Sequence, residues 1–306
     1  NKNFTKGKLK FKYPYQKPDE IKNASIQCKV IYEKIIKNLS KDLNNIHQLD
    51  WPDRSWKILI GPWLARYIET IYEKWGVVKK LKKNPKLILA LPKEDYNFHS
   101  FDFDDFANKS QSLYWNEQIF TYLIKKYTKI TIKKEKTSCE KEKKVSQKIN
   151  LSNFFFNFLI INVFKFLNLF QKNNDGVIYY SYISGILNKI KLNFKLNQVP
   201  QIYSYYYYKK KTNELKRKKI DYLNLEKDII NFRKNFKLRI AAGVDKTLCL
   251  ILQDLLKIML PSIYLENFKY FKSFENENIY PSNPKFVLTS CSPILKDEIF
   301  KYWGFN

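Results

Sequence analysis

Residues 51–76, WPDRSWKILIGPWLARYIETIYEKWG, hold four of the six tryptophans and two of the seven glycines of the chain. Large apolar residues recur there at every fourth position: Trp63, Tyr67, Ile71 and Trp75. This spacing predicts a helix with one apolar stripe, beginning near Gly61-Pro62 because proline suits the first turn of a helix. We expect Gly76 to end this helix. A stripe rich in tryptophan indicates either a packed core or a binding surface.

Helices and short apolar strands alternate outward from this stretch. The spacing of apolar residues predicts helices over residues 25–46, 54–75 with a break at 61–62, 111–127, 184–190, 209–240 and 244–260. Short apolar runs predict strands at residues 86–91, 177–183 and 285–290. Such alternation is typical of a layered α/β fold with a largely parallel sheet. We therefore expect a helix-rich α/β chain with a Rossmann-like sheet.

The segment 128–150 is polar and rich in Lys and Glu, which makes it the candidate domain boundary or insertion. On this basis residues 1–127 form a helical or α/β N-terminal part that carries the Gly61-Pro62 block. Residues 151–306 form a second, Rossmann-like α/β part. The chain begins with Asn rather than Met, and we expect it to be a piece of a longer protein.

The chain carries 56 basic and 29 acidic side chains, a formal net charge of +27. Only 5 of the basic residues are Arg, and Lys, Asn, Ile, Phe and Tyr are all abundant, as AT-rich codons produce. Phosphate-binding surfaces usually mix Arg with Lys, because the guanidinium group grips phosphate through two hydrogen bonds. The charge therefore indicates either solvated lysine faces or contact with an anionic partner: a membrane surface, a nucleotide-linked substrate or a nucleic acid.

Cysteine and histidine usage argues against a disulfide framework and against a zinc site. The four cysteines lie far apart without a C-x-x-C pair, and there are only two histidines, His47 and His99. We expect free thiols, no metal and no cofactor. The chain also lacks Walker, G-x-G-x-x-G and G-x-S-x-G motifs, which excludes phosphate-loop NTPases, dinucleotide-binding proteins and α/β-hydrolases.

Residues 151–170, LSNFFFNFLIINVFKFLNLF, are the one candidate for a membrane segment. Polar residues interrupt the run at Asn153, Asn157, Asn162, Lys165 and Asn168. They fall within about half of a helical wheel, and a spanning helix tolerates few such groups. We therefore expect an amphipathic helix that lies either on the protein core or on an anionic membrane surface.

Arg54 and Arg66 are two of the few arginines in a lysine-dominated chain. A guanidinium group held near aromatic rings binds a carboxylate or a phosphate well. The alternative is a structural ion pair with a neighbouring acid, for which the sequence offers three candidates: Asp50, Asp53 and Glu69.

Two motifs lie close together in this region: Leu43-Asn44 with His47, and R-S-W-K-I-L-I-G-P-W-L at residues 54–64. Together they resemble a family of bacterial transferases found in O-antigen and surface-polysaccharide gene clusters and first named from a spirochaete. The family carries Tyr and Arg where this chain has Ser55 and Lys57.

Later segments extend the likeness over nearly the whole chain: Asp102, Asp104 and Asp105; Tyr114-Trp-Asn116; Tyr180-Ser-Tyr182; Pro200; residues 260–266; and residues 284–290. The resemblance implies the first half of a two-domain, GT-B-type glycosyltransferase, with donor-binding residues beyond residue 306. It also implies a site, with a possible general base at His47 and substrate-binding residues Arg54, Trp56, Trp63, Arg66, Asp102, Asp104 and Asn116.

Three local patterns have more than one interpretation. The acids from Asp102 to Asp105 are a divalent-metal pair, an acidic loop that positions a sugar hydroxyl, or a solvated turn. His47 is either a general base or a structural residue near a helix end. Tyr205–Tyr208, followed by Lys209–Lys211, suits either single-stranded nucleic acid or an amphipathic strand that enters a basic helix.

Taken together, the sequence and the resemblance predict a cytoplasmic transferase, specifically a glycosyltransferase of surface-polysaccharide assembly, with peripheral contact to an anionic inner membrane. Its expected substrates are an activated sugar donor and a lipid-linked or glycan acceptor, without a specific nucleic acid. The alternative function is a basic nucleic-acid-binding module, which steeply salt-sensitive binding of arbitrary oligonucleotides would reveal.

Overall fold

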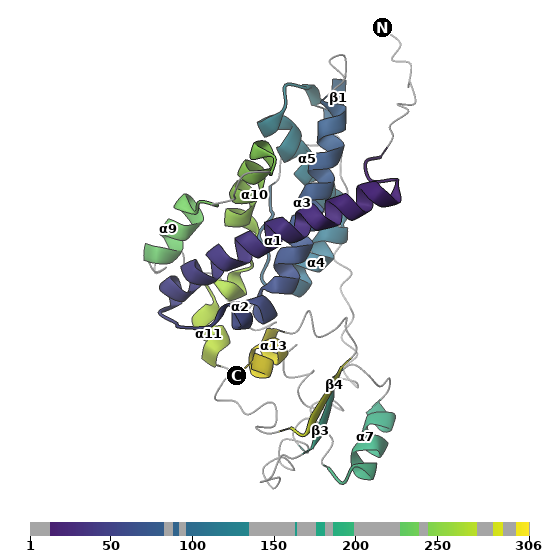
Figure 1. Cartoon of the computed structure of the whole chain (residues 1–306), viewed down its shortest axis with the longest axis vertical. Helices are drawn as coiled ribbons and strands as arrows, with labels where there is room; N and C mark the ends of the chain where they lie inside the picture. The colour runs from purple at the N-terminus through teal and green to yellow at the C-terminus, as the bar shows by residue number, and fades with distance from the viewer. Residues whose placement is uncertain are drawn as a thin grey trace.

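The computed structural model describes residues 13–82, 88–91, 96–134, 163, 176–180, 186–198, 227–238, 244–273, 284–289 and 298–305. Helices dominate this part of the chain (Figure 1). The predicted amphipathic helix at 151–170 and the aromatic and basic run at 205–211 lie outside the described residues, apart from Val163.

The helices are α1 (Pro18–His47), α2 (Asp53–Leu59), α3 (Gly61–Leu81), α4 (Phe103–Gln111), α5 (Leu113–Tyr127), α7 (Ile186–Lys195), α9 (Lys227–Asn235), α10 (Lys246–Met259), the 3-10 turn η1 (Ser262–Tyr264), α11 (Phe268–Lys272) and α13 (Glu298–Phe305). The strands are β1 (Ile88–Leu91), β2 (Thr131–Lys134), β3 (Val177–Tyr180) and β4 (Phe286–Thr289).

The apolar stripe of α3 forms the centre of the core. Its members Trp63, Tyr67 and Ile71 are fully buried, and Trp75 is nearly so. Helices α1, α2, α4, α5 and α10 all pack against α3 (Figure 1). This burial confirms that the stripe is part of a packed core. Burying one such side chain contributes about 1.5–3 kcal/mol.

Polar groups at the edge of the stripe tie α3 to α10. The Tyr67 hydroxyl donates to the Leu252 carbonyl at 2.6 Å, which satisfies a polar atom inside the core. The Trp75 indole donates to Asp245 at 3.3 Å, and Asp245 also caps α10 through the Thr247 amide at 2.8 Å. One acid thus begins α10 and fixes it against α3.

The predicted break at Gly61-Pro62 is confirmed, because α2 ends at Leu59 and α3 begins at Gly61. The prediction that Gly76 ends the helix is wrong. Two further apolar residues, Val77 and Val78, are buried on the same helix, which continues to Leu81. Gly76 instead leaves room for the ring of Tyr15, which lies directly over it.

The predicted Rossmann-like parallel sheet is wrong. In the described ranges the strands form two separate two-stranded parallel ladders, β1 with β2 and β3 with β4. The apolar runs of β1, β3 and β4 were identified correctly, but each strand is four residues long and the core is made by helices packing on helices. The expected likeness to the first half of a GT-B-type fold is also wrong, because it required that sheet.

One core unites segments from both sides of the 128–150 boundary. The buried cluster contains residues of α1–α5 together with residues of α10, η1, α11 and α13. Figure 1 places β3, β4 and α7 at one end of the molecule, next to α13 and away from α3, α5 and α10. The division into 1–127 and 151–306 remains a prediction.

Candidate functional site

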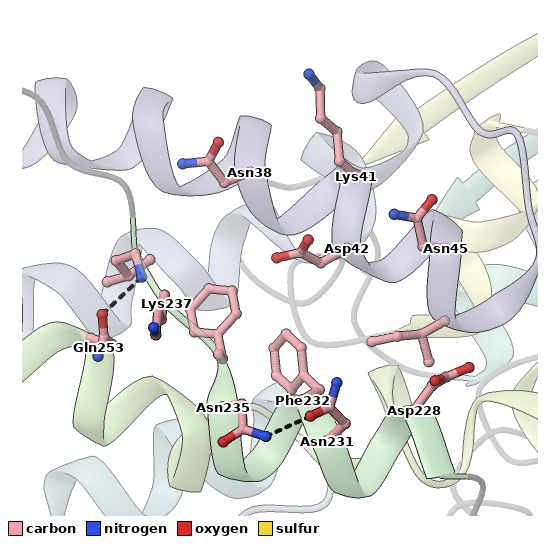
Figure 2. Close-up of a pocket in the computed structure, with 13 residues that line it drawn as sticks. Asn38, Lys41, Asp42, Asn45, Asp228, Asn231, Phe232, Asn235, Lys237 and Gln253 are labelled. Carbon is pink, nitrogen blue, oxygen red and sulfur yellow. Dashed lines mark hydrogen bonds between the residues drawn. The ribbon is translucent and has the colours of Figure 1, made fainter.

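A groove of about 840 Å³ lies between α1 and α9 (Figure 2). Helix α1 contributes Asn38, Lys41, Asp42, Asn45 and Ile46. Helix α9 and the chain after it contribute Asp228, Asn231, Phe232, Asn235, Phe236, Lys237 and Leu238, and α10 adds Gln253. The volume is in the range of small-molecule sites.

Two matching rows of polar side chains form the walls. On α1 the row is Asn38, Asp42 and Asn45; on α9 it is Asp228, Asn231 and Asn235. Spacings of three and four residues place each row along one helix face. Each helix turns its buried apolar residues to another side, so the polar rows stay at the surface.

Aromatic rings and fixed amides give the groove a defined surface. Phe232 and Phe236 are both about 5–6% exposed, and their ring centroids are 4.7 Å apart. The Asn235 side chain donates to the side-chain oxygen of Asn231 at 2.6 Å (Figure 2). Gln253 accepts from the Leu238 backbone amide at 2.9 Å. These bonds orient amide groups that border the cavity.

Arg233 fixes the α9 wall. Its guanidinium group donates to both carboxylate oxygens of Glu266, at 2.7 and 2.8 Å. It also donates to the carbonyls of Lys257 at 2.6 Å and Leu260 at 2.9 Å. A planar fork with several donors suits this arrangement, and Lys cannot reproduce it. Arg233 therefore positions the groove without lining it.

A second groove, of about 430 Å³, lies beside the Gly61-Pro62 block. Its lining combines Lys29, Tyr32 and Lys57 with the thiol-bearing Cys28. Lys57 forms an ion pair with Glu33 at 2.9 Å, so one of the two lysines that line this groove is already paired. Burial raises the pKa of the Cys28 thiol to about 12, which keeps it protonated and unreactive.

The L-N-x-x-H motif and Trp56 meet around Asn44. The Asn44 amide donates to the Trp51 carbonyl at 2.8 Å and accepts from the Trp56 indole at 2.7 Å. The His47 ring stacks on Phe268 with centroids 4.0 Å apart, and its Nε2 lies 3.0 Å from the Tyr264 carbonyl. That nitrogen is the donor, because a carbonyl only accepts.

The other residues of the 54–66 block divide between core and surface. Trp63 is buried and stacks on Tyr67 with ring centroids 5.3 Å apart. Arg54 and Arg66 are exposed on α2 and α3. Within the described ranges neither arginine has a hydrogen-bond or ion-pair partner, so the predicted ion pairs with Asp50, Asp53 or Glu69 do not form there.

The acidic segment begins α4. Asp102 is buried and accepts from the Asp105 amide at 2.7 Å, while Asp105 accepts from the Phe101 amide at 2.9 Å. This reciprocal pattern is a helix cap. Asp104 accepts from Asn108 at 3.3 Å. Asn116 donates to the carbonyls at 110 and 112, and its buried side-chain oxygen has no hydrogen-bond partner among the described residues.

A buried charged cluster joins α13 to the acidic segment. Glu298 accepts from the Tyr264 hydroxyl at 2.7 Å and from the Phe103 amide at 3.2 Å, and it pairs with Lys301. Lys301 also donates to the Leu59 carbonyl at 2.8 Å. Burial raises the pKa of Glu298 to about 7, against the opposite effect of Lys301.

The described residues contain no group of three or more His, Cys, Asp or Glu side chains that is arranged to hold a metal ion. Within the same residues, no helix has the length and apolar content needed to cross a membrane. Cys28 and Cys249 are free thiols. The remaining two cysteines, Cys139 and Cys291, lie outside the described residues.

A family model described as LIC12162 family transferase matches residues 1–306. The chain belongs to the LIC12162 transferase family. This confirms the resemblance to a transferase family named from a spirochaete, and it makes the protein a transferase. No curated protein and no solved structure matches the chain.

Within this LIC12162 family member, the sequence analysis and the groove identify different residues. None of the eight predicted site residues lines the α1–α9 groove; they lie in the core, at helix caps or on exposed faces of α2 and α3. The groove residues escaped notice because Asn is abundant throughout the chain. A usable signal was the repeat of one acid and two amides at three- and four-residue spacing in 38–45 and 228–235.

Proposed function

We propose that this transferase is a glycosyltransferase of bacterial surface-polysaccharide assembly, using an activated sugar donor and a lipid-linked or glycan acceptor. Family membership supports transfer chemistry in general. The carbohydrate part of the proposal is supported by one observation, the two facing rows of amides and carboxylates in the α1–α9 groove.

Sugars are recognised through their hydroxyl groups, which donate and accept hydrogen bonds at once. Amide side chains offer both roles, and carboxylates accept from two hydroxyls together. The groove supplies four asparagines, Asn38, Asn45, Asn231 and Asn235, and two aspartates, Asp42 and Asp228. The buried Phe232 and Phe236 supply apolar side chains at the base of the groove.

The roles of the predicted site residues belong to the same proposal. Arg54 and Arg66 are exposed cations with rigid forks, which suits contact with a diphosphate or a carboxylate. His47 remains the proposed base, acting through Nδ1 because Nε2 faces the Tyr264 carbonyl. The proposed place of work is the cytoplasmic face of the inner membrane, where +27 charges favour anionic lipid.

Genetic complementation with the complete natural protein tests the proposal. A strain that lacks the gene is complemented with wild type, Arg54→Lys, or the control Lys37→Arg on the exposed face of α1. Extracted surface polysaccharide is resolved on a gel, and protein levels are matched by immunoblotting. We expect wild type and the control to restore the polysaccharide, and Arg54→Lys to restore clearly less.

Two outcomes would contradict the proposal. If the deletion strain makes normal polysaccharide, the protein does not serve that assembly. If polysaccharide is lost but sugar composition and linkage analysis find every glycosyl unit still transferred, the protein transfers another group.

A further inference from the structure

The α1–α9 groove is electrically balanced in a chain that is strongly basic. Its lining contains two lysines, Lys41 and Lys237, and two aspartates, Asp42 and Asp228, which sum to zero. The whole chain carries +27. We infer that this groove binds the uncharged acceptor glycan and not the anionic sugar donor, an inference that rests on the proposed glycosyl transfer.

The placement of the charges favours a neutral ligand. Lys41 points away from the space between the helices, whereas Asp42 lies on the side of α1 that faces α9 (Figure 2). Asp228 stands on the opposite wall. A diphosphate entering between two carboxylates meets like charge on both sides, and that repulsion costs more where the walls exclude water.

The length of the groove favours an oligosaccharide over a single sugar. Each polar row extends over seven residue steps of helix, from Asn38 to Asn45 and from Asp228 to Asn235. At 1.5 Å per residue each row is about 10 Å long. A chain of linked sugar rings therefore meets amide groups on both sides along its whole length.

The walls are held in place before any ligand arrives. Arg233 ties α9 to α10 and to Glu266 through four hydrogen bonds, and Asn235 is already bonded to Asn231. A site of fixed amides loses little entropy on binding. An acceptor that must be gripped repeatedly while a polysaccharide is built suits such a surface.

Glycan-array binding, followed by titration calorimetry on the hits, tests the inference. The proteins are wild type, the double variant Asn45→Ala/Asn235→Ala, and the control Asn23→Ala. All three asparagines are exposed, and Asn23 lies on α1 outside the groove. Circular dichroism checks that each variant is folded, and the single variant Asp42→Asn serves as a second probe.

We expect hits among neutral oligosaccharides, at least tenfold weaker binding by the double variant, and wild-type affinity for Asn23→Ala. The affinity should change little between about 50 and about 300 mM salt, because no phosphate is contacted. UDP and UDP-glucose should bind the double variant as they bind wild type.

Three results would overturn the inference: hits confined to acidic glycans, hits that the double variant retains in full, or no glycan hit at all. Loss of UDP-glucose binding in the double variant would also overturn it by making the groove the donor site. Loss of UDP-glucose binding would contradict the groove assignment but not the proposed glycosyl transfer. A failure of the proposed glycosyl transfer would appear in the polysaccharide analysis instead.

Discussion

Asn44 connects α1, the turn at Trp51 and α2 through one amide side chain. We expect Asn44→Ala to lower the free energy of unfolding by about 2–3 kcal/mol, because the Trp56 indole inside the core loses its acceptor. Urea unfolding followed by tryptophan fluorescence measures the loss. The adjacent exposed residue gives a control: Asn45→Ala should stay within about 0.5 kcal/mol of wild type. Equal losses at the two positions would contradict the role given to Asn44.

The burial of Glu298 should make the stability of the fold depend on pH. Its pKa is about 7 in the folded protein and 4.5 as an ordinary carboxyl group, so between these values the folded state holds more protons. The free energy of unfolding should therefore fall as pH rises from about 4.5 through about 7. Unfolding curves at several pH values should show a steeper fall for wild type than for Glu298→Gln. Parallel profiles would mean that Glu298 titrates normally.

Among the arginines, the sequence could not distinguish exposed from clamping residues. Rarity in a lysine-rich chain drew attention to Arg54 and Arg66, which are exposed on α2 and α3. Arg233 makes the four-bond clamp instead. Its partners lie 24–33 residues further along the chain. Local sequence patterns do not predict contacts at that separation. The Asn44 contacts, by contrast, lie within 12 residues of chain, and Asn44 and Trp56 both belong to the motifs that carry the resemblance.

Arg233 anchors helix α9 through four hydrogen bonds. We expect Arg233→Lys to make local opening of Lys227–Asn235 easier by about 1–3 kcal/mol, a lower figure than for a fully buried pair because Arg233 is 18% exposed. Hydrogen exchange read by mass spectrometry should show roughly tenfold or faster exchange in α9 and little change in α10. The exposed neighbour supplies the control, since Lys234→Ala should leave exchange as in wild type.

Helix α3 tests the packing role of Gly76. An added Cβ would lie 2.9 and 3.0 Å from two ring carbons of Tyr15, so Gly76→Ala should displace that ring and expose residues 13–17 to limited proteolysis. When the Tyr15 ring is removed, the effect of Gly76→Ala on stability should change from destabilising to stabilising. Tyr15→Ala/Gly76→Ala should be more stable than Tyr15→Ala by up to about 1 kcal/mol, because Ala is the better helix former. A stabilising Gly76→Ala in the wild-type background would refute the contact.

Element prediction succeeded where a long apolar pattern decided the structure. The periodicity over 25–46, 54–75 and 244–260 located α1, the α2–α3 pair and α10. The short helices α4, α11 and α13 escaped prediction. Their stability comes from caps and distant partners such as the Asp102 cap and the Glu298 cluster, and a segment of five to nine residues carries too little periodicity to reveal that.

At the scale of the whole molecule, the net charge should act without specificity. We expect labelled oligonucleotides of arbitrary sequence to bind only weakly, through diffuse attraction to lysine, and to lose roughly tenfold in affinity between about 50 and about 200 mM salt. Fluorescence anisotropy measures this binding, and Asn45→Ala/Asn235→Ala should leave it unchanged because the groove carries no net charge. Tight binding at about 50 mM salt that falls by roughly 10³-fold or more at about 200 mM salt, or binding lost in that variant, would favour the nucleic-acid-binding alternative.

The fold class failed for a reason visible at this scale. Alternating strands and helices are a local feature, whereas a layered sheet requires that all its strands join in one hydrogen-bonded sheet. Here β1 pairs with β2 and β3 pairs with β4, in two ladders kept apart by the helical core (Figure 1). Sequence pattern located strands and helices but held no information on which strand would find which partner.

The hydrogen bond from Lys301 to the Leu59 carbonyl spans 242 residues of chain. During synthesis, α1, α2 and α3 leave the ribosome long before α13 exists to cover the end of α2. Trp51 and the apolar surface that Tyr302 later covers must therefore stay exposed on the nascent chain during most of its translation. Such exposure invites chaperone binding and aggregation. Ribosome-bound chains halted before residue 298 should recruit trigger factor more strongly than chains halted after the whole of α13 has emerged.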